Sequence, residues 1–284
     1  MATVLAAVDL TPLGRRVADR TRMIAEEIGG DMAVLHSIEP LTEAFVDPGV
    51  ADMIRAHRRT VIDEITEWCM GRTDVSVRPH LVKGSPSYEV AKASKHAELV
   101  VVGSSTVDSP QVGPTAFRVA ETAKNDVLVV RRQPRNPYRR VLVGVDMSEG
   151  SARAVEAALR WAPSAEVTVA HILPSRFDPL MIAAGMFPEE VDQARRRRLE
   201  QAGMKLEEFA QRWPGRVRTF LADGPADALL EETVRRRSAD LVVVGSRGAG
   251  ATRIVLLGTV ASAVLRSMPS DVLVARVPGE FRRP

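Results

Sequence analysis

The stretch LVVVGSRGAGATRIVLLGTV, residues 241–260, decides the fold of this chain. Its apolar run Leu241–Val244 predicts a buried strand, and a helical pattern begins at Thr259. Closely spaced glycines between them let the backbone approach a ligand, and the pair Gly258-Thr259 opens the helix. Unpaired amides and the positive end of a helix attract an anion. The stretch therefore indicates a strand–loop–helix unit that binds phosphate.

The chain contains such a unit twice, because segments recur in the same order at nearly constant spacing. The spacing grows only from 137 residues, between Val4 and Val141, to 145 residues, between Asp126 and Asp271. The sequence therefore predicts duplicated domains at residues 1–133 and 138–284, joined by the linker RRQPRNPYRR. The recurring segments are VLAAVD and VLVGVD (4–9 and 141–146), GSP and GPA (84–86 and 224–226), ELVVVGSS and DLVVVGSR (98–105 and 240–247), and DVLVVR and DVLVAR (126–131 and 271–276).

Each copy alternates short β-branched runs with helical patterns, which predicts a parallel sheet covered by helices on both faces. In the first copy, Thr11 is expected to cap a helix that Pro12 begins. The strands expected in the second copy are residues 141–145, 167–172, 216–220, 241–244 and 272–275, and its helices are 151–161, 189–213, 226–236 and one from residue 259.

Composition places the chain among soluble globular proteins, with 45% hydrophobic and 26% charged residues. The 39 basic and 36 acidic residues nearly cancel, and the arginine runs 195–198 and 235–237 are interpreted as solvated helix faces, so nucleic-acid binding has little support. No apolar run reaches the ~18 residues of a membrane span. Because the start lacks a basic signal-peptide region and Cys69 is the single cysteine, we expect a cytoplasmic protein.

The chain resembles the universal stress proteins, as a tandem pair of such domains that covers nearly its whole length. The resemblance rests on the Val-Asp pairs that end the first strands, on VTVAHI at residues 167–172, and above all on G-x2-G-x9-G-[ST] followed by DVLV. It implies an α/β fold of two tandem doubly wound domains, each a five-stranded parallel sheet of order 3-2-1-4-5, of the adenine nucleotide alpha hydrolase-like type. Nucleotide is expected at the carboxyl ends of strands one and four, where strand order reverses.

The resemblance and the glycine loop together predict one ATP site, in the second copy. Strand-end residues would contact the adenosine, loop glycines would let amides wrap the phosphates, and the helix start would add amides and a hydroxyl. Asp146 is expected to contact base or ribose, with helix capping as its alternative role, and it is the candidate to help hold Mg2+. The predicted nucleotide-binding residues are Val145, Asp146, Ile172, Gly245, Arg247, Gly248, Gly250, Gly258, Thr259 and Val260.

The first copy departs from this pattern. Gly103 matches Gly245, but Thr106 stands where Gly248 would be, and the loop is shorter. Pro114 replaces the Thr259 equivalent and so removes one amide and one hydroxyl together. Asp9 is retained, so an adenine-like pocket can persist without a phosphate cradle. We therefore expect the first copy to bind ATP weakly or not at all.

Phosphate binding here comes without recognisable catalytic machinery. The chain lacks both the P-loop lysine motif and G-x-G-x-x-G after either first strand, and His36 and His171 are interpreted as packed side chains. No catalytic triad or metal-ligand cluster is evident. The leading hypothesis is a largely non-catalytic ATP-binding stress-response regulator whose nucleotide occupancy modulates contact with signalling or regulatory proteins. The alternatives are a slow ATP hydrolase or AMP-transferring enzyme on the same fold, and an interaction module without nucleotide.

The fifth strands determine the expected assembly. DVLVVR and DVLVAR would each leave an unpaired sheet edge. The resemblance implies that these strands pair across a pseudo-twofold axis, so that the two copies form an internal dimer. A homodimer of the whole chain is a further expectation.

Overall fold

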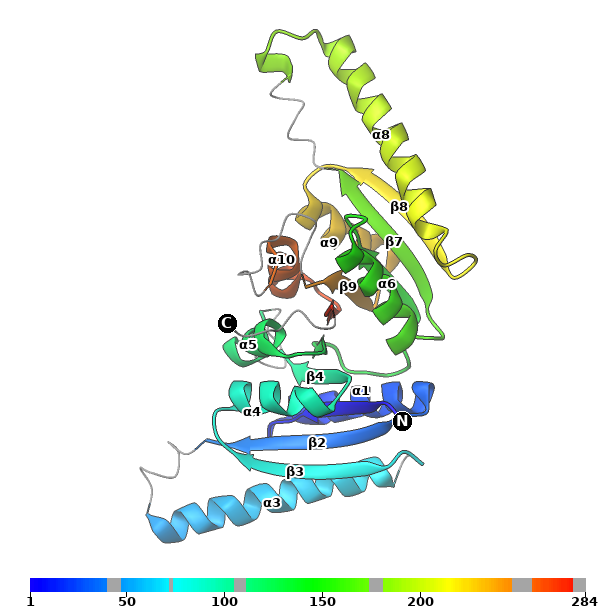
Figure 1. Ribbon diagram of the computed structural model, residues 1–284. Helices are drawn as coiled ribbons and strands as arrows, with labels where there is room; N and C mark the ends of the chain where they lie inside the picture. The colour runs from blue at the N-terminus through cyan, green and yellow to red at the C-terminus, as the bar shows by residue number, and fades with distance from the viewer. Residues whose placement is uncertain (40–46, 72–73, 105–110, 174–180, 247–256, 278–284) are drawn as a thin grey trace.

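The computed structural model describes residues 1–39, 47–71, 74–104, 111–173, 181–246 and 257–277. In this part of the chain ten strands form one sheet, in the order β3-β2-β1-β4-β5-β10-β9-β6-β7-β8 (Figure 1). The N-terminal copy comprises β1 (Thr3–Ala7), α1 (Pro12–Ile28), β2 (Asp31–Ile38), α3 (Pro48–Met70), β3 (Val77–Lys83), α4 (Pro86–Ala93), η1 (Ser94–His96), β4 (Leu99–Gly103), α5 (Pro114–Thr122) and β5 (Asp126–Val130). The C-terminal copy comprises β6 (Arg140–Gly144), α6 (Glu149–Trp161), β7 (Glu166–Leu173), α8 (Pro188–Ala210), β8 (Val217–Asp223), α9 (Ala226–Arg237), β9 (Leu241–Gly245), α10 (Thr259–Ser267) and β10 (Asp271–Ala275).

Each half of the sheet has the predicted parallel order 3-2-1-4-5. Alternating residues of a strand serve opposite faces, so Val4 packs in the core under α1 and α3, whereas Leu5 packs under α4 and α5. The C-terminal copy repeats this arrangement, with α6 and α8 over one face and α9 and α10 over the other. These layers explain why the central strands, such as β4 and β9, read as almost continuous apolar runs.

The predicted element boundaries agree with the structure to within a few residues. Thr11 caps α1 by accepting a hydrogen bond from the Leu13 amide, and Pro12 opens the helix, as expected. One helix is shorter than predicted, because α8 ends at Ala210 rather than Trp213. Pro214 follows Trp213 and disfavours helical geometry there.

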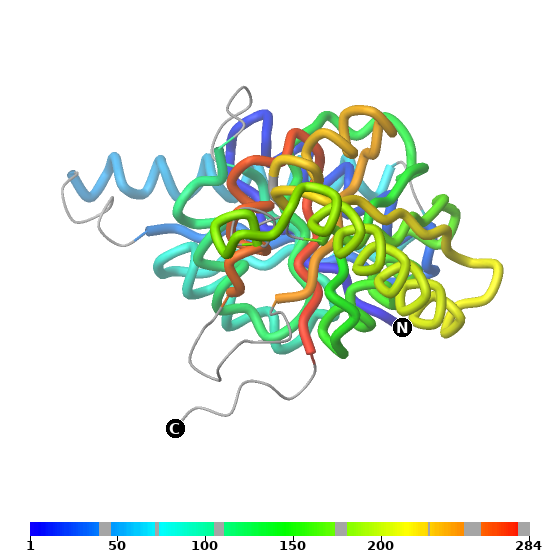
Figure 2. The backbone as a smooth tube through the Cα atoms, turned by 90° about the horizontal axis from the view of Figure 1, so that it is seen from above, coloured from blue at the N-terminus to red at the C-terminus, as the bar shows by residue number. Residues whose placement is uncertain are grey.

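The two halves join through their fifth strands, which confirms the predicted internal pairing. β5 and β10 run antiparallel, with Val129 opposite Val272 and Val127 opposite Val274. All residues of both strands are buried. The joint therefore covers the β5 edge of one domain and the β10 edge of the other, and leaves β3 and β8 as the edges of the common sheet. The halves overlie each other when viewed from above (Figure 2).

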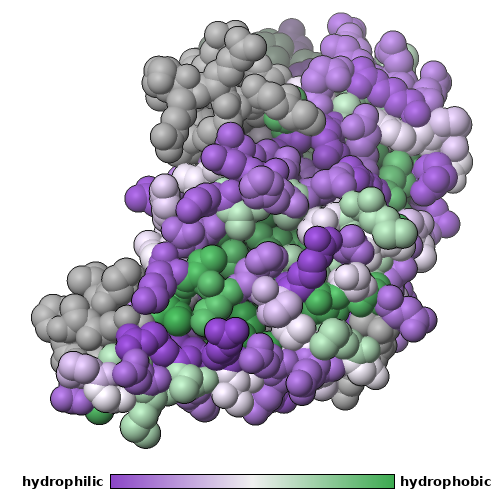
Figure 3. All heavy atoms as spheres, turned by 60° about the horizontal axis from the view of Figure 1, so that its bottom comes forward, coloured by the Kyte–Doolittle hydropathy of each residue, from purple (hydrophilic) through white to green (hydrophobic). Residues whose placement is uncertain are grey.

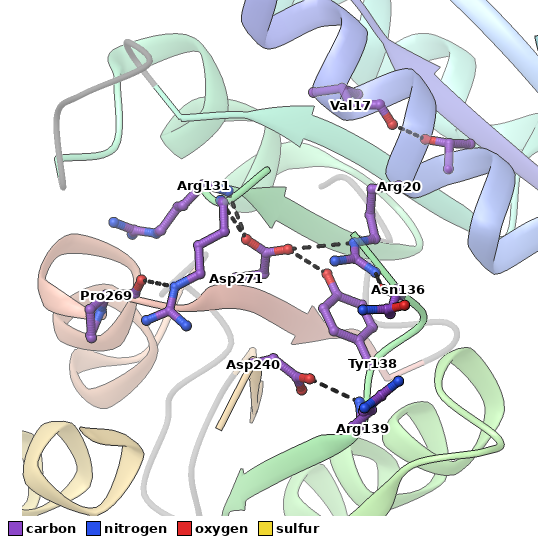
Figure 4. A network of polar contacts seen from close by, with 11 residues as sticks. Val17, Arg20, Arg131, Asn136, Tyr138, Arg139, Asp240, Pro269 and Asp271 are labelled. Atoms are coloured by element: carbon purple, nitrogen blue, oxygen red, sulfur yellow. Dashed lines mark hydrogen bonds and ion pairs between the residues drawn. The ribbon is translucent and has the colours of Figure 1, made fainter. Parts of the chain in front are cut away.

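Two buried aspartates hold this joint together. Asp271 Oδ1 accepts the Arg131 amide at 2.8 Å, and Asp271 Oδ2 accepts the Tyr138 hydroxyl at 2.7 Å (Figure 4). Arg20 lies over the Tyr138 ring at 3.9 Å and forms an ion pair with Asp271 at 3.7 Å. Asp126 mirrors this role from the other copy, because its carboxylate accepts the Arg276 amide, the Trp161 indole and the Arg153 guanidinium.

The linker contributes directly to this network. Tyr138 is 2% exposed and Arg131 is 8% exposed, although both belong to the charged, proline-containing segment between the domains. Burial, together with the neighbouring Asp271 carboxylate, raises the pKa of Tyr138 well above its ordinary value. The linker is therefore an anchored part of the interdomain core.

The surface is not uniformly hydrophilic. With the N-terminal half turned forward, apolar residues gather in the middle of the visible face and hydrophilic ones border them (Figure 3). Large apolar side chains are also exposed near the start of each long helix, including Met53 on α3 and Phe187 just before α8. Apolar surface of this kind can serve protein contacts.

Candidate functional site

The candidate site lies at the carboxyl edge of the sheet, where strand order reverses between the first and fourth strands of each copy. In the C-terminal copy β6 and β9 are hydrogen-bonded neighbours, and the chain leaves β6 toward β7 and β9 toward β10. The helices that follow, α6 and α10, begin on opposite faces of the sheet. A ligand at this point can therefore meet two strand ends and two helix starts.

Asp146 follows β6 and is held by the start of α6. Its Oδ1 accepts hydrogen bonds from the Ser148 amide at 3.1 Å and the Ser148 hydroxyl at 2.5 Å, and it also accepts the Ser151 hydroxyl. Ser148 itself is the N-cap of α6. The sequence left two roles open for Asp146, helix capping and ligand contact. Its carboxylate supports the N-cap of the helix, and its side chain is also exposed at the end of the strand. Contact with base or ribose stays a prediction.

Val145 and Ile172 lie beside Asp146 at the ends of the neighbouring strands. Val145 is 8% exposed, and its amide donates to the Ala170 carbonyl at 2.9 Å. Ile172 is partly buried against the opposite core. His171 packs as expected, with its Nδ1 2.8 Å from the Val145 carbonyl oxygen, and this contact holds the ends of the two strands together.

Gly258, Thr259 and Val260 lie at the start of α10. The Gly258 amide donates to the Ser246 carbonyl at 2.7 Å, which places the helix start directly beside the end of β9. The first intrahelical bond there runs from the Ser262 amide to the Gly258 carbonyl, so the Thr259 and Val260 amides have no acceptor within the helix. Thr259 and Val260 are exposed, and no acidic side chain occupies the first turn. This helix start suits an anion.

Gly245 ends β9 as predicted. Arg247, Gly248 and Gly250 lie outside the described residues, so their part in the phosphate loop is a prediction from sequence.

The N-terminal copy has a cavity of about 270 Å3 at the corresponding place. Its lining includes Val8, Asp9 and Gly103, which the internal repeat matches to Val145, Asp146 and Gly245. The Asp9 carboxylate accepts the Thr11 amide and hydroxyl and the Gly14 amide, as Asp146 does with its own helix. The full described lining is Ala7, Val8, Asp9, Leu13, Gly14, Val17, Leu35, His36, Ser37, Pro86, Val90, Val102, Gly103, Ser104, Gly113, Pro114, Thr115 and Ala116.

This cavity lacks, at one position, the hydrogen-bond donors that the start of α10 offers in the other copy. Pro114 occupies the first position of α5 and presents neither an amide nor a hydroxyl. The Gly113 cap nevertheless has φ −71° and ψ 163°, close to the −68° and 161° of Gly258. The two helix starts therefore share a backbone shape and differ in their hydrogen-bond donors.

The serines that brace the strand-end aspartate were not identified from sequence. Ser148 and Ser151 follow Asp146 at spacings of two and five residues, and Asp-x-Ser is a recognisable turn signal. His36 Nε2 and Ser104 Oγ, beside the N-terminal cavity, are buried without a hydrogen-bond partner among the residues that the structure describes, and no sequence pattern marks them.

In the described part of the chain, three or more His, Cys, Asp or Glu side chains do not gather in an arrangement that could hold a metal ion. Nor does any described helix combine the length and apolar character that crossing a membrane requires.

Comparison with known proteins agrees with this arrangement. A model of the universal stress protein family matches residues 1–131 and 137–276. A universal stress protein of Mycobacterium tuberculosis is 30% identical over 219 residues, which cover 71% of this chain and 70% of that protein. One from Mycolicibacterium smegmatis is 27% identical over 267 residues, covering 86% and 87%. The crystal structure of a universal stress protein from Archaeoglobus fulgidus superposes with a TM-score of 0.68 at 19% identity, covering 96% of this chain and 98% of that one, and shows that the fold is shared.

Proposed function

The chain belongs to the universal stress protein family, and on that premise we propose that it is an ATP-binding, largely non-catalytic stress-response regulator. Nucleotide binding to the C-terminal copy changes a surface that a signalling or regulatory protein contacts. The proposal includes a cytoplasmic location, which suits the single cysteine, and a homodimer of the chain.

The start of α10 is the observation that carries this proposal. Among the described residues, the Thr259 and Val260 amides and the Thr259 hydroxyl have no hydrogen-bond partner, and the Gly258–Ser246 hydrogen bond holds them beside the end of β9. The glycine loop that the sequence predicts to wrap phosphates connects the same two elements. An exposed helix start with available donors favours a phosphate over a neutral ligand.

The adenosine end of ATP has a matching surface. Asp146, fixed by two serines, offers a carboxylate to ribose hydroxyls or to an amino group. Val145 and Ile172 add apolar area from the adjoining strand ends. Mg2+ bound to the phosphates is part of the proposal, and Asp146 is the residue that would help hold it. ATP would supply the phosphate charge that the α10 amides attract.

Calorimetry with ATP tests the proposal, together with the melting temperature and ATP turnover. We expect one site per chain, and ATP at a hundredfold excess over Kd should stabilise the fold by about 2.7 kcal/mol. Turnover should stay below about one per second, at the low end of enzyme rates. No stabilisation by millimolar ATP would favour the interaction module, and faster turnover would favour the hydrolase or AMP-transferring enzyme. Two tight ATP sites per chain would contradict the proposal of a single ATP site.

A further inference from the structure

A second hollow, which the proposed ATP site does not use, lies between α4 and α5 of the N-terminal copy. Its volume is about 610 Å3, within the range of small-molecule sites. Its described lining carries the cations Lys92, Lys95, Arg118 and Lys124 and contains no carboxylate. We call this hollow the basic groove. α4 and α5 pack side by side on one face of the sheet (Figure 1).

The cations of the basic groove are poorly neutralised. Lys92 approaches Glu89 at 3.7 Å, a long ion pair. Lys95, Arg118 and Lys124 form no ion pair with any acid in the described part of the chain. Many other basic side chains of this protein do have acidic partners, such as Arg78 with Asp31. The groove thus gathers four like charges, of which only Lys92 has an acidic partner among the described residues.

The C-terminal copy serves as an internal comparison. The repeat spacing, 140 residues at Gly84 and Gly224 and 145 residues at Gly113 and Gly258, identifies the equivalent positions. At the places of Lys92, Lys95, Arg118 and Lys124 stand Glu232, Arg235, Ala263 and Pro269.

The one cation kept at these positions in the C-terminal copy is neutralised. Arg235 pairs with Glu231 at 2.8 Å, and Glu232 pairs with Arg236 at 2.6 Å. The duplicated fold therefore does not itself require a basic groove here, and the uncompensated charge is particular to the N-terminal copy.

Hydrogen bonds fix the backbone on which the cations stand. The Lys124 amide donates to Ser94 Oγ at 3.0 Å. The Asn125 side chain donates to the carbonyls of Ser94 and Ala97 at 2.8 and 2.7 Å. These bonds tie the end of α5 to η1, which carries Lys95. The charges are thus brought together by the fold, and an anion between them would relieve their repulsion.

Helix dipoles explain part of this pattern but not all of it. Lys92, Lys95 and Lys124 lie at or just beyond helix C-termini, where cations are favourable. Arg118 lies in the middle of α5 and gains little from that effect. The dipole also does not account for the lack of acidic side chains in the lining.

The chemistry of the lining favours phosphate. A guanidinium binds phosphate through paired hydrogen bonds, and the Ser85 and Ser87 hydroxyls, 3.3 Å apart, leave one O–H of the pair to donate to an anion. Several separated cations match several anionic groups on one ligand. We propose that the basic groove binds a small molecule carrying two or more phosphate groups, at a site separate from the one at α10.

Titration of the full chain with inorganic tripolyphosphate tests this proposal. The double variant Lys95→Glu/Arg118→Glu should bind at least about tenfold more weakly than the parent chain, because charge-assisted hydrogen bonds are lost. The matched control Arg235→Glu, on the C-terminal copy, should bind normally. Raising NaCl from about 50 to about 300 mM should also weaken binding. Undiminished binding by the double variant, or an equal loss in the control, would overturn the proposal.

Two further measurements distinguish the basic groove from the α10 site and from a nucleic-acid surface. Thr259→Pro, which alters only the α10 site, should leave binding of tripolyphosphate to the basic groove in place. If Thr259→Pro abolishes all tripolyphosphate binding while the double variant retains it, the anion belongs to the α10 site and the proposal fails. Tighter binding of a single-stranded oligonucleotide than of tripolyphosphate, lost in the double variant, would make the groove a nucleic-acid surface and also refute it.

Discussion

Exchanging one residue between the two copies gives the sharpest test of the ATP site. Thr259→Pro places in α10 the residue that α5 already carries at its first position. The Gly113 and Gly258 caps have nearly the same backbone angles, and the first intrahelical bonds measure 3.0 and 2.9 Å. Proline is well tolerated at the first position of a helix. We therefore expect the fold to accept this change.

The loss of affinity can be worked out from the donors that disappear. Thr259→Pro removes one amide and one hydroxyl, neither of which has a hydrogen-bond partner in the described part of the chain. A hydrogen bond to a charged group contributes about 1.5–3 kcal/mol. Two such bonds at the lower end amount to about 3 kcal/mol, or roughly a hundredfold in Kd. Thr259→Val keeps the amide and loses only the hydroxyl, so it should weaken ATP about tenfold.

Calorimetry with ATP measures both variants, and thermal unfolding without ATP serves as the control for folding. The apo melting temperature should stay within about 2 °C of the parent chain, since neither change reaches the core. Thr259→Pro binding ATP within threefold of the parent chain would refute the assignment of phosphates to the start of α10. Equal losses in both variants would show that the amide contributes nothing.

Three other changes, with one control variant, test the loop and the joint. Gly248→Asp puts a carboxylate into the predicted phosphate loop and should abolish ATP binding with little effect on folding, so unchanged affinity by calorimetry would contradict the loop assignment. Asp271→Asn replaces a carboxylate that accepts several buried donors by an amide with one oxygen acceptor. It should lower the free energy of unfolding in urea by about 3 kcal/mol. Asp52→Asn, whose side chain is 75% exposed, is the control and should change it by less than about 0.5 kcal/mol. Because the folded pKa of Tyr138 is raised above 10.0, its contribution is complete below pH 10 and is lost as the pH rises further. Tyr138→Phe should therefore lose less stability above pH 10 than the parent chain. Identical pH profiles of the unfolding free energy for the two proteins would disprove this contribution of Tyr138.

Much of the fold could be predicted because its signals are local. The apolar run Leu241–Val244 is a strand because β-branched residues suit a sheet buried on both faces. Thr11-Pro12 starts a helix because the threonine oxygen accepts an amide and proline needs no acceptor. Repetition of these signals, together with the family resemblance, led to the strand order and to the region of the candidate site.

The joint between the copies depended on information that no local pattern carries. The sequence marked the fifth strands as edges, and the pairing came only from resemblance. Asp126 and Asp271 lie 145 positions apart and are polar residues at the starts of apolar strands. Their burial follows from donors that the opposite copy and the linker bring to them. Burial of a carboxylate depends on its partners, which are set by long-range contacts.

The sequence by itself determined the duplication and the alternation of strands and helices in each half, and its family resemblance added the strand order and the place where nucleotide is expected. Only the tertiary structure showed that the linker is buried at Tyr138, that the N-terminal copy has a cavity, and that Lys95 and Arg118 line one groove. The physical reason is the range of the forces involved. Backbone preferences and apolar periodicity act over a few neighbouring residues, whereas cavities and clustered charges arise where separate helices and strands pack together.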